Sequence, residues 1–252
     1  MKRLPNISFT PEELQNIVKT GLFNKEGGEA IVTFSLNPHA LYKIFIDTNT
    51  GEIIEMPENK LKKLSQLFKL QLQNSVKPLS TITMDKKLVG YEMTYDEANL
   101  PIGLVKFTRK EMIEVLKSTK NILEYFSAQD ITYGDIKNNN ILINQKTGQI
   151  TFCDMDNVRI ATYPIDLMGK DLKKYTDIHQ AVDRTTDAYM HNLLTLKSLG
   201  FPNPYATSAG IIMSLEKEEY PTGFKEKAKP ILKSMLTPET FTGEYIIQYI
   251  KR

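Results

Sequence analysis

The sequence has too few cysteines and histidines for most metal centres. Cys153 is the single cysteine among 252 residues, which excludes an intramolecular disulfide or a thiolate cluster and indicates a reducing compartment. The three histidines, His39, His179 and His191, stand far apart and lack metal-ligand spacing. We therefore expect any chemistry to rest on carboxylates, lysines and amides.

The sequence also lacks a strong net charge and a long apolar run. Its 32 basic and 30 acidic side chains leave a formal charge of +2, so we expect no nucleic-acid partner. No stretch is long enough to span a bilayer, and residues 1–14 lack the apolar core of a secretory signal. We expect a cytoplasmic protein without a membrane partner, whose hydrophobic content of 41% suffices for one large or two small domains.

The first third of the chain has the pattern of a β-rich domain. Short apolar runs between turn residues predict strands at 17–24, 30–36, 40–46, 80–84 and 88–95. A helix is predicted after Pro57, because the leucines that follow it recur on one helical face. We interpret the lysines of this helix as a solvated face; they are Lys60, Lys62, Lys63 and Lys69.

The remainder of the chain is mostly helical in pattern. Thr108 and Glu111 form a capping-box sequence, which predicts a helix to about Ala128. Two short apolar runs, 141–143 and 150–153, predict a hairpin. The polar connector before Pro101 separates the strand-rich part of the sequence from the helical part, so we expect two lobes, 1–95 and 96–252.

Three polar side chains stand at fixed offsets just before the predicted hairpin, and a carboxylate follows it. They are Asp135, Lys137 and Asn140, with Asp154 fourteen residues after Asn140. Phosphoryl transfer requires such a set, because a carboxylate accepts the acceptor's proton, a lysine neutralises the phosphoryl group, and oxygen ligands hold magnesium. Aspartate and asparagine are also ordinary turn residues, so a solvated loop explains each one alone. The joint spacing favours the chemical interpretation.

The stretch YGDIKNNNILIN, followed by DMD, resembles the protein-kinase superfamily, whose signature is H-R-D-x-K-x-x-N and then D-F-G. The resemblance implies ATP and Mg2+ as cofactors, Asp135 as the catalytic base and Lys137 as the lysine that neutralises the phosphoryl group. It implies Asn140 and Asp154 as magnesium ligands, with Asp156 as a further carboxylate ligand. The implied fold is α+β and bilobal: a small antiparallel β-sheet lobe with one main helix, a larger and mostly helical lobe, and the nucleotide between them.

The resemblance extends to the first lobe. Lys43 would contact the α- and β-phosphates, and Glu58 would pair with it, with Glu55 as the alternative. The backbone amides of Gly27 and Gly28 would cover the phosphates. Backbone groups of the predicted hinge would meet the adenine edge at Glu92, Met93 and Thr94.

In the second lobe, Asp187 resembles the helix aspartate that braces the catalytic-loop backbone in this family. Tyr133 and Gly134 replace the family's histidine and arginine, so the arginine that clamps an activation-loop phosphate is missing. Asp156 replaces the glycine of D-F-G. The usual glutamate–arginine anchor of the substrate-side segment cannot form, because residues 155–215 contain no glutamate.

Three functions are compatible with these residues. The G-D loop and the D-x-D segment also resemble aminoglycoside and choline kinases, which phosphorylate small molecules. Lys137 is instead the choice of Ser/Thr protein kinases, so we favour a compact bacterial or phage-type kinase-like enzyme that acts on Ser or Thr hydroxyls of a protein substrate. The third interpretation is a nucleotide-binding pseudokinase that serves as an interaction module. Lys43, Asp135, Asn140 and Asp154 together argue against it, because a pure scaffold has no physical need for all four.

Overall fold

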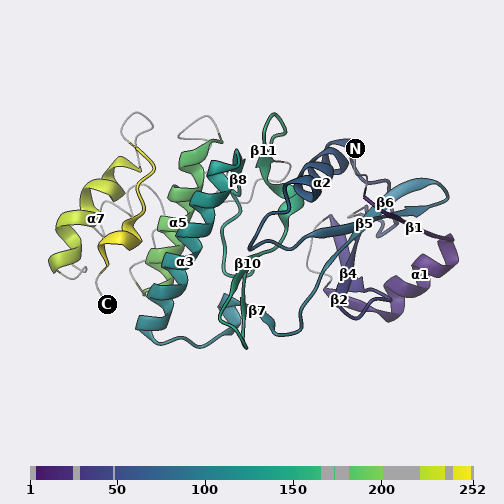
Figure 1. The fold of residues 1–252 in the computed structure, drawn as a ribbon, viewed down its shortest axis with the longest axis horizontal. Coiled ribbons are helices and arrows are strands. Elements are labelled where there is room, and N and C mark those ends of the chain that lie inside the picture. The colour runs from purple at the N-terminus through teal and green to yellow at the C-terminus, as the bar shows by residue number, and fades with distance from the viewer. Residues whose placement is uncertain are drawn as a thin grey trace. The chain divides into compact units, whose positions relative to one another are not determined.

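The computed structural model describes residues 4–24, 29–47, 49–165, 173, 182–200, 222–235 and 241–250. Over these residues the protein is a mixed α/β structure with an antiparallel-rich six-stranded sheet, two smaller sheets and five α-helices (Figure 1). The chain divides into two compact units. The first is 1–100 with 143–156, and the second is 101–142 with 157–252. Among the described helices, none combines the length and apolar character needed to cross a bilayer.

The main sheet belongs to the first unit and has the strand order β1-β5-β6-β4-β3-β2. Adjacent strands in this sheet pair antiparallel, except that β1 pairs parallel with β5. The strands are β1 (Asn6–Phe9), β2 (Leu22–Asn24), β3 (Ala30–Phe34), β4 (Ala40–Phe45), β5 (Pro78–Met84) and β6 (Lys87–Thr94). Strands β3 to β6 confirm the predicted strands in those stretches.

Helix α1 (Pro11–Thr20) occupies the first half of the stretch where the apolar pattern predicts the first strand, so that prediction is wrong before Leu22. The Thr10 hydroxyl accepts a hydrogen bond from the Glu13 amide, and the Glu13 carboxylate accepts one from the Thr10 amide. With Pro11 in the first turn, this capping box starts a helix. Local capping therefore makes residues 11–20 a helix. The expectation for this lobe is a small antiparallel sheet with one main helix; the structure adds helix α1 and the parallel strand β1.

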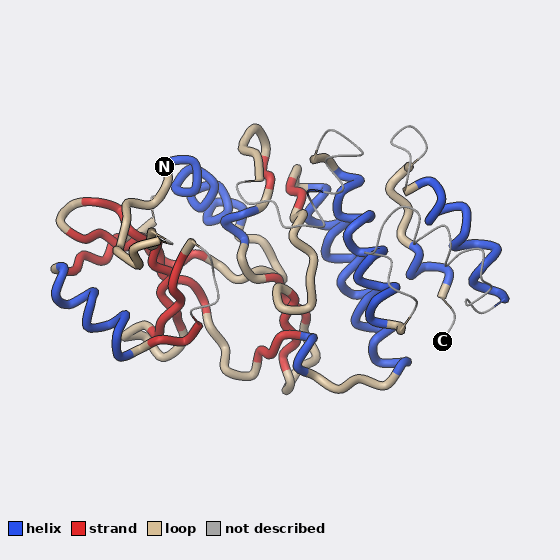
Figure 2. Tube along the Cα trace, turned by 180° about the vertical axis from the view of Figure 1, so that it is seen from behind, coloured by secondary structure: helices blue, strands red, loops and turns tan. Residues whose placement is uncertain are grey.

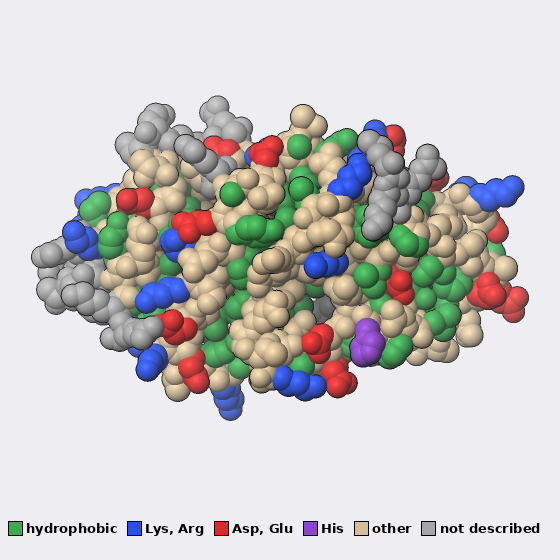
Figure 3. Space-filling view, viewed as in Figure 1, with side chains coloured by type: hydrophobic (Ala, Val, Ile, Leu, Met, Phe, Trp, Pro, Cys, Tyr) green, Lys and Arg blue, Asp and Glu red, His purple; other side chains and the backbone are tan. Residues whose placement is uncertain are grey.

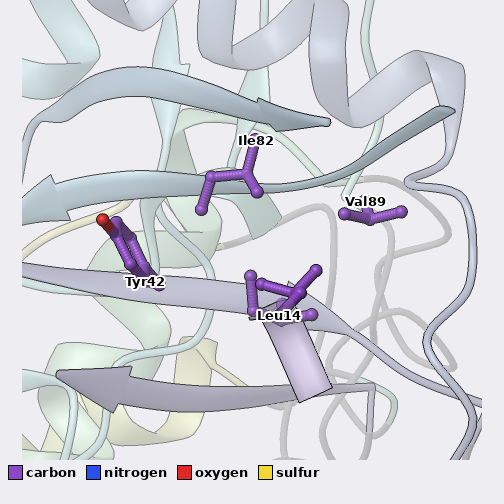
Figure 4. Packing of buried hydrophobic residues seen from close by; sticks show 5 residues of the cluster. Leu14, Tyr42, Ile82 and Val89 are labelled. Carbon is purple, nitrogen blue, oxygen red and sulfur yellow. The ribbon is translucent and has the colours of Figure 1, made fainter. Parts of the chain in front are cut away.

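A hydrophobic cluster joins α1 to the sheet (Figure 4). Leu14 of α1 packs with Tyr42 of β4, Ile82 of β5 and Val89 of β6, and each is at most 2% exposed. Burying a side chain of this size stabilises the fold by about 1.5–3 kcal/mol. The cluster therefore holds α1 against one face of the sheet.

Helix α2 (Glu58–Leu70) confirms the helix predicted after Pro57 but not its charged face. Lys60 and Lys63 lie in the same buried stripe as Leu64 and Leu67, whereas the other two lysines of the run are exposed. Positions three, four and seven residues apart share one face of a helix. The interpretation of the lysine run as a solvated face is therefore wrong for Lys60 and Lys63.

The second unit is built around two helices that run side by side, α3 (Arg109–Ala128) and α5 (Arg184–Ser198), as both views show (Figures 1 and 2). The predicted capping box of Thr108 and Glu111 is present at the start of α3. Helix α3 buries Ile113, Leu116, Leu123 and Phe126. Later elements of this unit are α7 (Thr222–Ser234) and the 3-10 turn η3 (Ile246–Tyr249).

The remaining strands form two small sheets. One has the order β10-β9-β7, with β7 (Asn99–Pro101), β9 (Ile141–Asn144) and β10 (Ile150–Phe152), and β9 and β10 confirm the predicted hairpin. The other pairs β8 (Ile131–Thr132) with β11 (Arg159–Ile160). Two 3-10 turns are η1 (Ile102–Leu104) and η2 (Met155–Asn157). On the face shown in Figure 3, basic and acidic side chains are interspersed, as the near-balanced charge leads one to expect.

His191 of α5 lies fully buried between the main helices of the second unit. Its Nε2 N–H donates to the Leu116 carbonyl at 2.9 Å, and the Thr195 hydroxyl lies 3.3 Å from Nδ1. Burial lowers the pKa of His191 to about 4, and the positive charge of Lys120 acts in the same direction, while the bond to Leu116 opposes both. The folded protein therefore holds this ring neutral in mild acid.

We expect His191→Gln to reduce the loss of stability between pH 6.5 and 4. In the wild type the unfolded ring binds a proton in this window and the folded ring resists it, so the free energy of unfolding falls as the pH falls, by up to about 3 kcal/mol from this group. Melting temperatures measured from pH 4 to 7.5 should show the wild type losing its advantage over the variant as the pH falls. His39→Gln, at an exposed turn, serves as the control. Parallel pH profiles for wild type and His191→Gln would contradict the prediction.

Candidate active site

The second unit brings three of the predicted residues together on one carboxylate. Asp135 Oδ2 accepts hydrogen bonds from Lys137 Nζ at 2.7 Å and from Asn140 Nδ2 at 2.8 Å. Asn140 Nδ2 also donates to the Asp135 carbonyl at 3.0 Å, which closes the loop on itself. The Asp135 side chain remains 23% exposed, so a solvent-borne hydroxyl can reach it.

A buried carboxylate on α5 shapes this loop. The amides of Tyr133 and Gly134 donate to the two Asp187 oxygens at 2.9 and 2.7 Å, which is the bracing contact that the resemblance implies for Asp187. Gly134 has a φ of 74°, a left-handed conformation that glycine adopts without strain. This geometry gives a backbone reason for glycine where the kinase signature has arginine. Burial raises the pKa of Asp187 to about 7, while the two amide bonds act in the opposite direction.

The first unit brings a second set of predicted residues together. Lys43 Nζ on β4 lies 2.5 Å from Asp154 Oδ1 and 2.8 Å from Asp156 Oδ1. Burial disfavours the ammonium, but Asp156 and the other neighbouring acidic groups outweigh it, so the pKa of Lys43 is raised. Asp154 follows β10 with a φ of 59°, a left-handed conformation that aspartate tolerates better than most residues. Its side chain is 32% exposed, whereas that of Lys43 is 7% exposed.

Asp156 lies entirely in the interior of the first unit, which does not fit its predicted role as a magnesium ligand. Its Oδ1 accepts from Lys43 Nζ and from the Tyr91 hydroxyl, each at 2.8 Å. Its Oδ2 accepts from Lys60 Nζ at 3.2 Å. Burial alone would raise the pKa of Asp156, but Lys43 and Lys60 outweigh it and hold that pKa far below its ordinary value. Both oxygens thus serve ammonium and hydroxyl donors rather than a metal ion.

The structure does not pair Glu58 with Lys43. Glu58 is in the first turn of α2 with its side chain 79% exposed, and its carboxylate contacts Lys62 at 2.7 Å. The alternative, Glu55, is also exposed. Lys60 lies two residues after Glu58, on the opposite face of α2, and it is Lys60 that projects into the interior. The helix therefore presents a lysine where the resemblance implies a glutamate.

The predicted hinge residues lie inside strand β6, so their expected contact with adenine does not fit the structure. Glu92, Met93 and Thr94 pair with β4 on one side, and the strand pairs with β5 on the other. An inner strand commits its backbone donors and acceptors to its two neighbours. The Glu92 carboxylate accepts from the Ser35 hydroxyl at 2.7 Å and the Ser80 hydroxyl at 3.0 Å. Gly27 and Gly28, predicted to cover the phosphates, lie outside the described residues.

Sequence reasoning missed three residues of the first-unit cluster, which are Lys60, Tyr91 and Glu29. Lys60 Nζ lies 2.5 Å from Glu29 Oε1, in addition to its contact with Asp156. The helical spacing of Lys60 with Leu64 and Leu67 was a usable signal, because it places the lysine on the apolar face. Tyr91 and Glu29 had no such signal.

Among the described residues, no group of three or more histidine, cysteine, aspartate or glutamate side chains is placed to hold a metal ion. No protein-family model matches the chain, and no curated protein matches its sequence.

We expect Asp187→Asn to loosen the loop that carries Asp135. An asparagine keeps one acceptor but turns an NH2 group toward the second backbone N–H, and an unsatisfied buried donor costs about 1–3 kcal/mol. Hydrogen exchange followed by mass spectrometry should show faster exchange at the amides of Tyr133 and Gly134.

Asp183→Asn is the matched control for this prediction. Asp183 caps the same helix, its side chain accepts from the Thr185 amide, and asparagine caps helices as well as aspartate does. Unchanged exchange at residues 133 and 134 in Asp187→Asn would show that Asp187 does not brace the loop.

Proposed function

We propose that the protein is an ATP- and Mg2+-dependent phosphotransferase that transfers the γ-phosphoryl group to Ser or Thr hydroxyls of a protein. The observation that carries the proposal is the convergence of Lys137 and Asn140 on one carboxylate oxygen of Asp135. A carboxylate, a lysine and an amide in one braced loop are the side chains that phosphoryl transfer requires. The resemblance of YGDIKNNNILIN to a kinase catalytic loop points the same way.

Asp135 is the proposed general base. Its carboxylate orients the acceptor hydroxyl and takes the proton as the hydroxyl oxygen attacks the γ-phosphorus and the bond to the bridging oxygen of ADP breaks. The hydrogen bonds from Lys137 and Asn140 keep that carboxylate in one orientation. Lys137, with its side chain 54% exposed, can direct its positive charge toward the transferring group while Asn140 still holds the carboxylate.

Lys43 and Asp154 are the proposed phosphate and magnesium residues of the first unit. Magnesium, when bound, neutralises the phosphate oxygens of the nucleotide. It prefers oxygen ligands and is commonly held by one or two protein oxygens together with substrate phosphates, so the partly exposed carboxylate of Asp154 in the first unit suits it. The amide oxygen of Asn140, in the second unit, is also a ligand type that magnesium accepts. Lys43 is a point charge suited to the α- and β-phosphates.

A Ser or Thr acceptor is favoured by the contact between Lys137 and Asp135. A lysine two residues after the base is the arrangement of Ser/Thr protein kinases, and here its ammonium lies 2.7 Å from the base. A small-molecule acceptor and nucleotide binding without transfer are the competing functions, and the assay below separates them.

We expect Asp135→Asn to abolish transfer and to preserve nucleotide binding. Removing a general base lowers the rate by roughly 100-fold to 10,000-fold. The full chain is incubated with labelled ATP, Mg2+ and, in separate reactions, casein, an aminoglycoside or choline, and a fluorescent ATP analogue reports binding. Asp85→Asn is the control, because Asp85 is an exposed turn residue with positive φ that asparagine also tolerates.

Each outcome has a distinct meaning for the proposal. Labelled protein in the wild type and none in Asp135→Asn supports it. Equal labelling by the two proteins shows that the base is assigned wrongly. Label on the aminoglycoside or choline alone identifies a small-molecule kinase, binding without any labelled acceptor identifies a pseudokinase, and absence of binding overturns the proposal altogether.

A further inference from the structure

We infer that Asp156 is a positioning residue for Lys43 and that Lys60 of helix α2 locks it in place. The inference rests on the proposed phosphotransferase function, in which Lys43 contacts the nucleotide phosphates. It assigns the two carboxylates of the D-x-D segment different tasks: Asp154 serves the metal, and Asp156 serves the lysine.

Both oxygens of Asp156 face the ammonium of Lys43. The Lys43 Nζ lies 2.8 Å from Oδ1 and 3.1 Å from Oδ2 of Asp156. A lysine has a flexible four-carbon stem, and a two-point contact removes much of its rotamer freedom. Asp156 is itself held by the Tyr91 hydroxyl at 2.8 Å, so it is a fixed rather than a mobile partner.

The exposures of the two carboxylates separate their roles. Asp154 is 32% exposed and Asp156 is 0% exposed, although both contact Lys43. A metal that arrives with its nucleotide needs an accessible oxygen, which Asp154 provides. Asp156 remains as the buried counter-charge of Lys43 when Asp154 turns to the metal.

Lys60 ties Asp156 to the helix and to the start of β3. Its Nζ lies 3.2 Å from Asp156 Oδ2 and 2.5 Å from Glu29 Oε1, and it also stands over the Phe45 ring, 5.4 Å from the centroid. Its side chain is 2% exposed and that of Asp156 is 0% exposed, so water hardly screens their contact. A glutamate on this helix face could not bind Asp156. The helix therefore positions Lys43 indirectly: Lys60 holds the Asp156 carboxylate, and that carboxylate holds Lys43.

The decisive test compares Asp156→Asn with Asp154→Asn in two measurements. One is the Mg2+ concentration that gives half-maximal ATP turnover, and the other is the affinity for a fluorescent ATP analogue in EDTA. We expect Asp156→Asn to lower turnover and metal-free affinity by about tenfold to 100-fold and to leave the Mg2+ requirement unchanged, because misplacing a reacting-site group by about 1 Å costs about that much. Asp154→Asn should raise the Mg2+ requirement. An equal rise in the Mg2+ requirement of both variants would overturn the inference.

Tyr91→Phe and Lys60→Met keep the test decisive where Asp156→Asn fails to fold. Asp156→Asn leaves two buried ammonium groups without their shared carboxylate, which is strongly destabilising. Tyr91→Phe removes one hydrogen bond and no charge, so turnover should fall about fivefold with an unchanged Mg2+ requirement. Lys60→Met should also lower turnover and leave the Mg2+ requirement unchanged. Lys62 is an exposed lysine on the same helix, so Lys62→Met should have the turnover and Mg2+ requirement of the wild type.

The outcomes distinguish this inference from the function on which it rests. A wild type that fails to bind the ATP analogue overturns the proposed function. A wild type that binds and turns over ATP, with Tyr91→Phe and Lys60→Met both indistinguishable from it, overturns only the positioning role. A rise in Mg2+ requirement in either of those variants also overturns it, because neither residue would then act through Lys43.

Discussion

The first unit depends on a carboxylate that has no solvent exposure and two ammonium partners. Asp156 joins strand β4 through Lys43, helix α2 through Lys60 and strand β6 through Tyr91. Desolvating such charges costs several kcal/mol per ion, and only close pairing with further hydrogen bonds offsets it. Removing the Asp156 carboxylate would leave two buried ammonium groups without their shared partner. The cluster therefore specifies how these elements meet.

The second unit uses a buried aspartate in a different way. Asp187 accepts from two backbone amides, whereas Asp156 accepts from two full positive charges. The effect on ionisation differs accordingly: burial prevails at Asp187 and raises its pKa to about 7, and the lysines prevail at Asp156 and lower its pKa. Amide dipoles suffice to shape a loop, while ammonium groups are needed to keep a deeply buried carboxylate charged.

Local signals predicted most of the regular elements, and they failed where two local signals competed. Strands β3 to β6 and helix α3 follow from apolar patterning and a capping box. Helix α1 was missed because the strand prediction at residues 17–24 took no account of the Thr10 to Glu13 capping sequence that starts the helix. In the candidate site, the contacts of Asp135, Lys137 and Asn140 are local and followed from spacing. The contact of Lys43 with Asp154 spans 111 residues and was not predicted, because the resemblance implied a glutamate partner for Lys43 and a metal for Asp154.

The sequence by itself favoured chemistry on carboxylates, lysines and amides over thiolate or histidine metal centres, because it has one cysteine and three histidines far apart in the chain. It also placed Asp135, Lys137 and Asn140 within six consecutive residues, so that their side chains meet in one short loop. Only the tertiary structure decided that Lys60 is buried, that Glu58 is not, and that Asp156 faces two lysines. The reason is physical: which face of a helix is buried, and which carboxylate meets which ammonium, depends on packing between segments far apart in the chain.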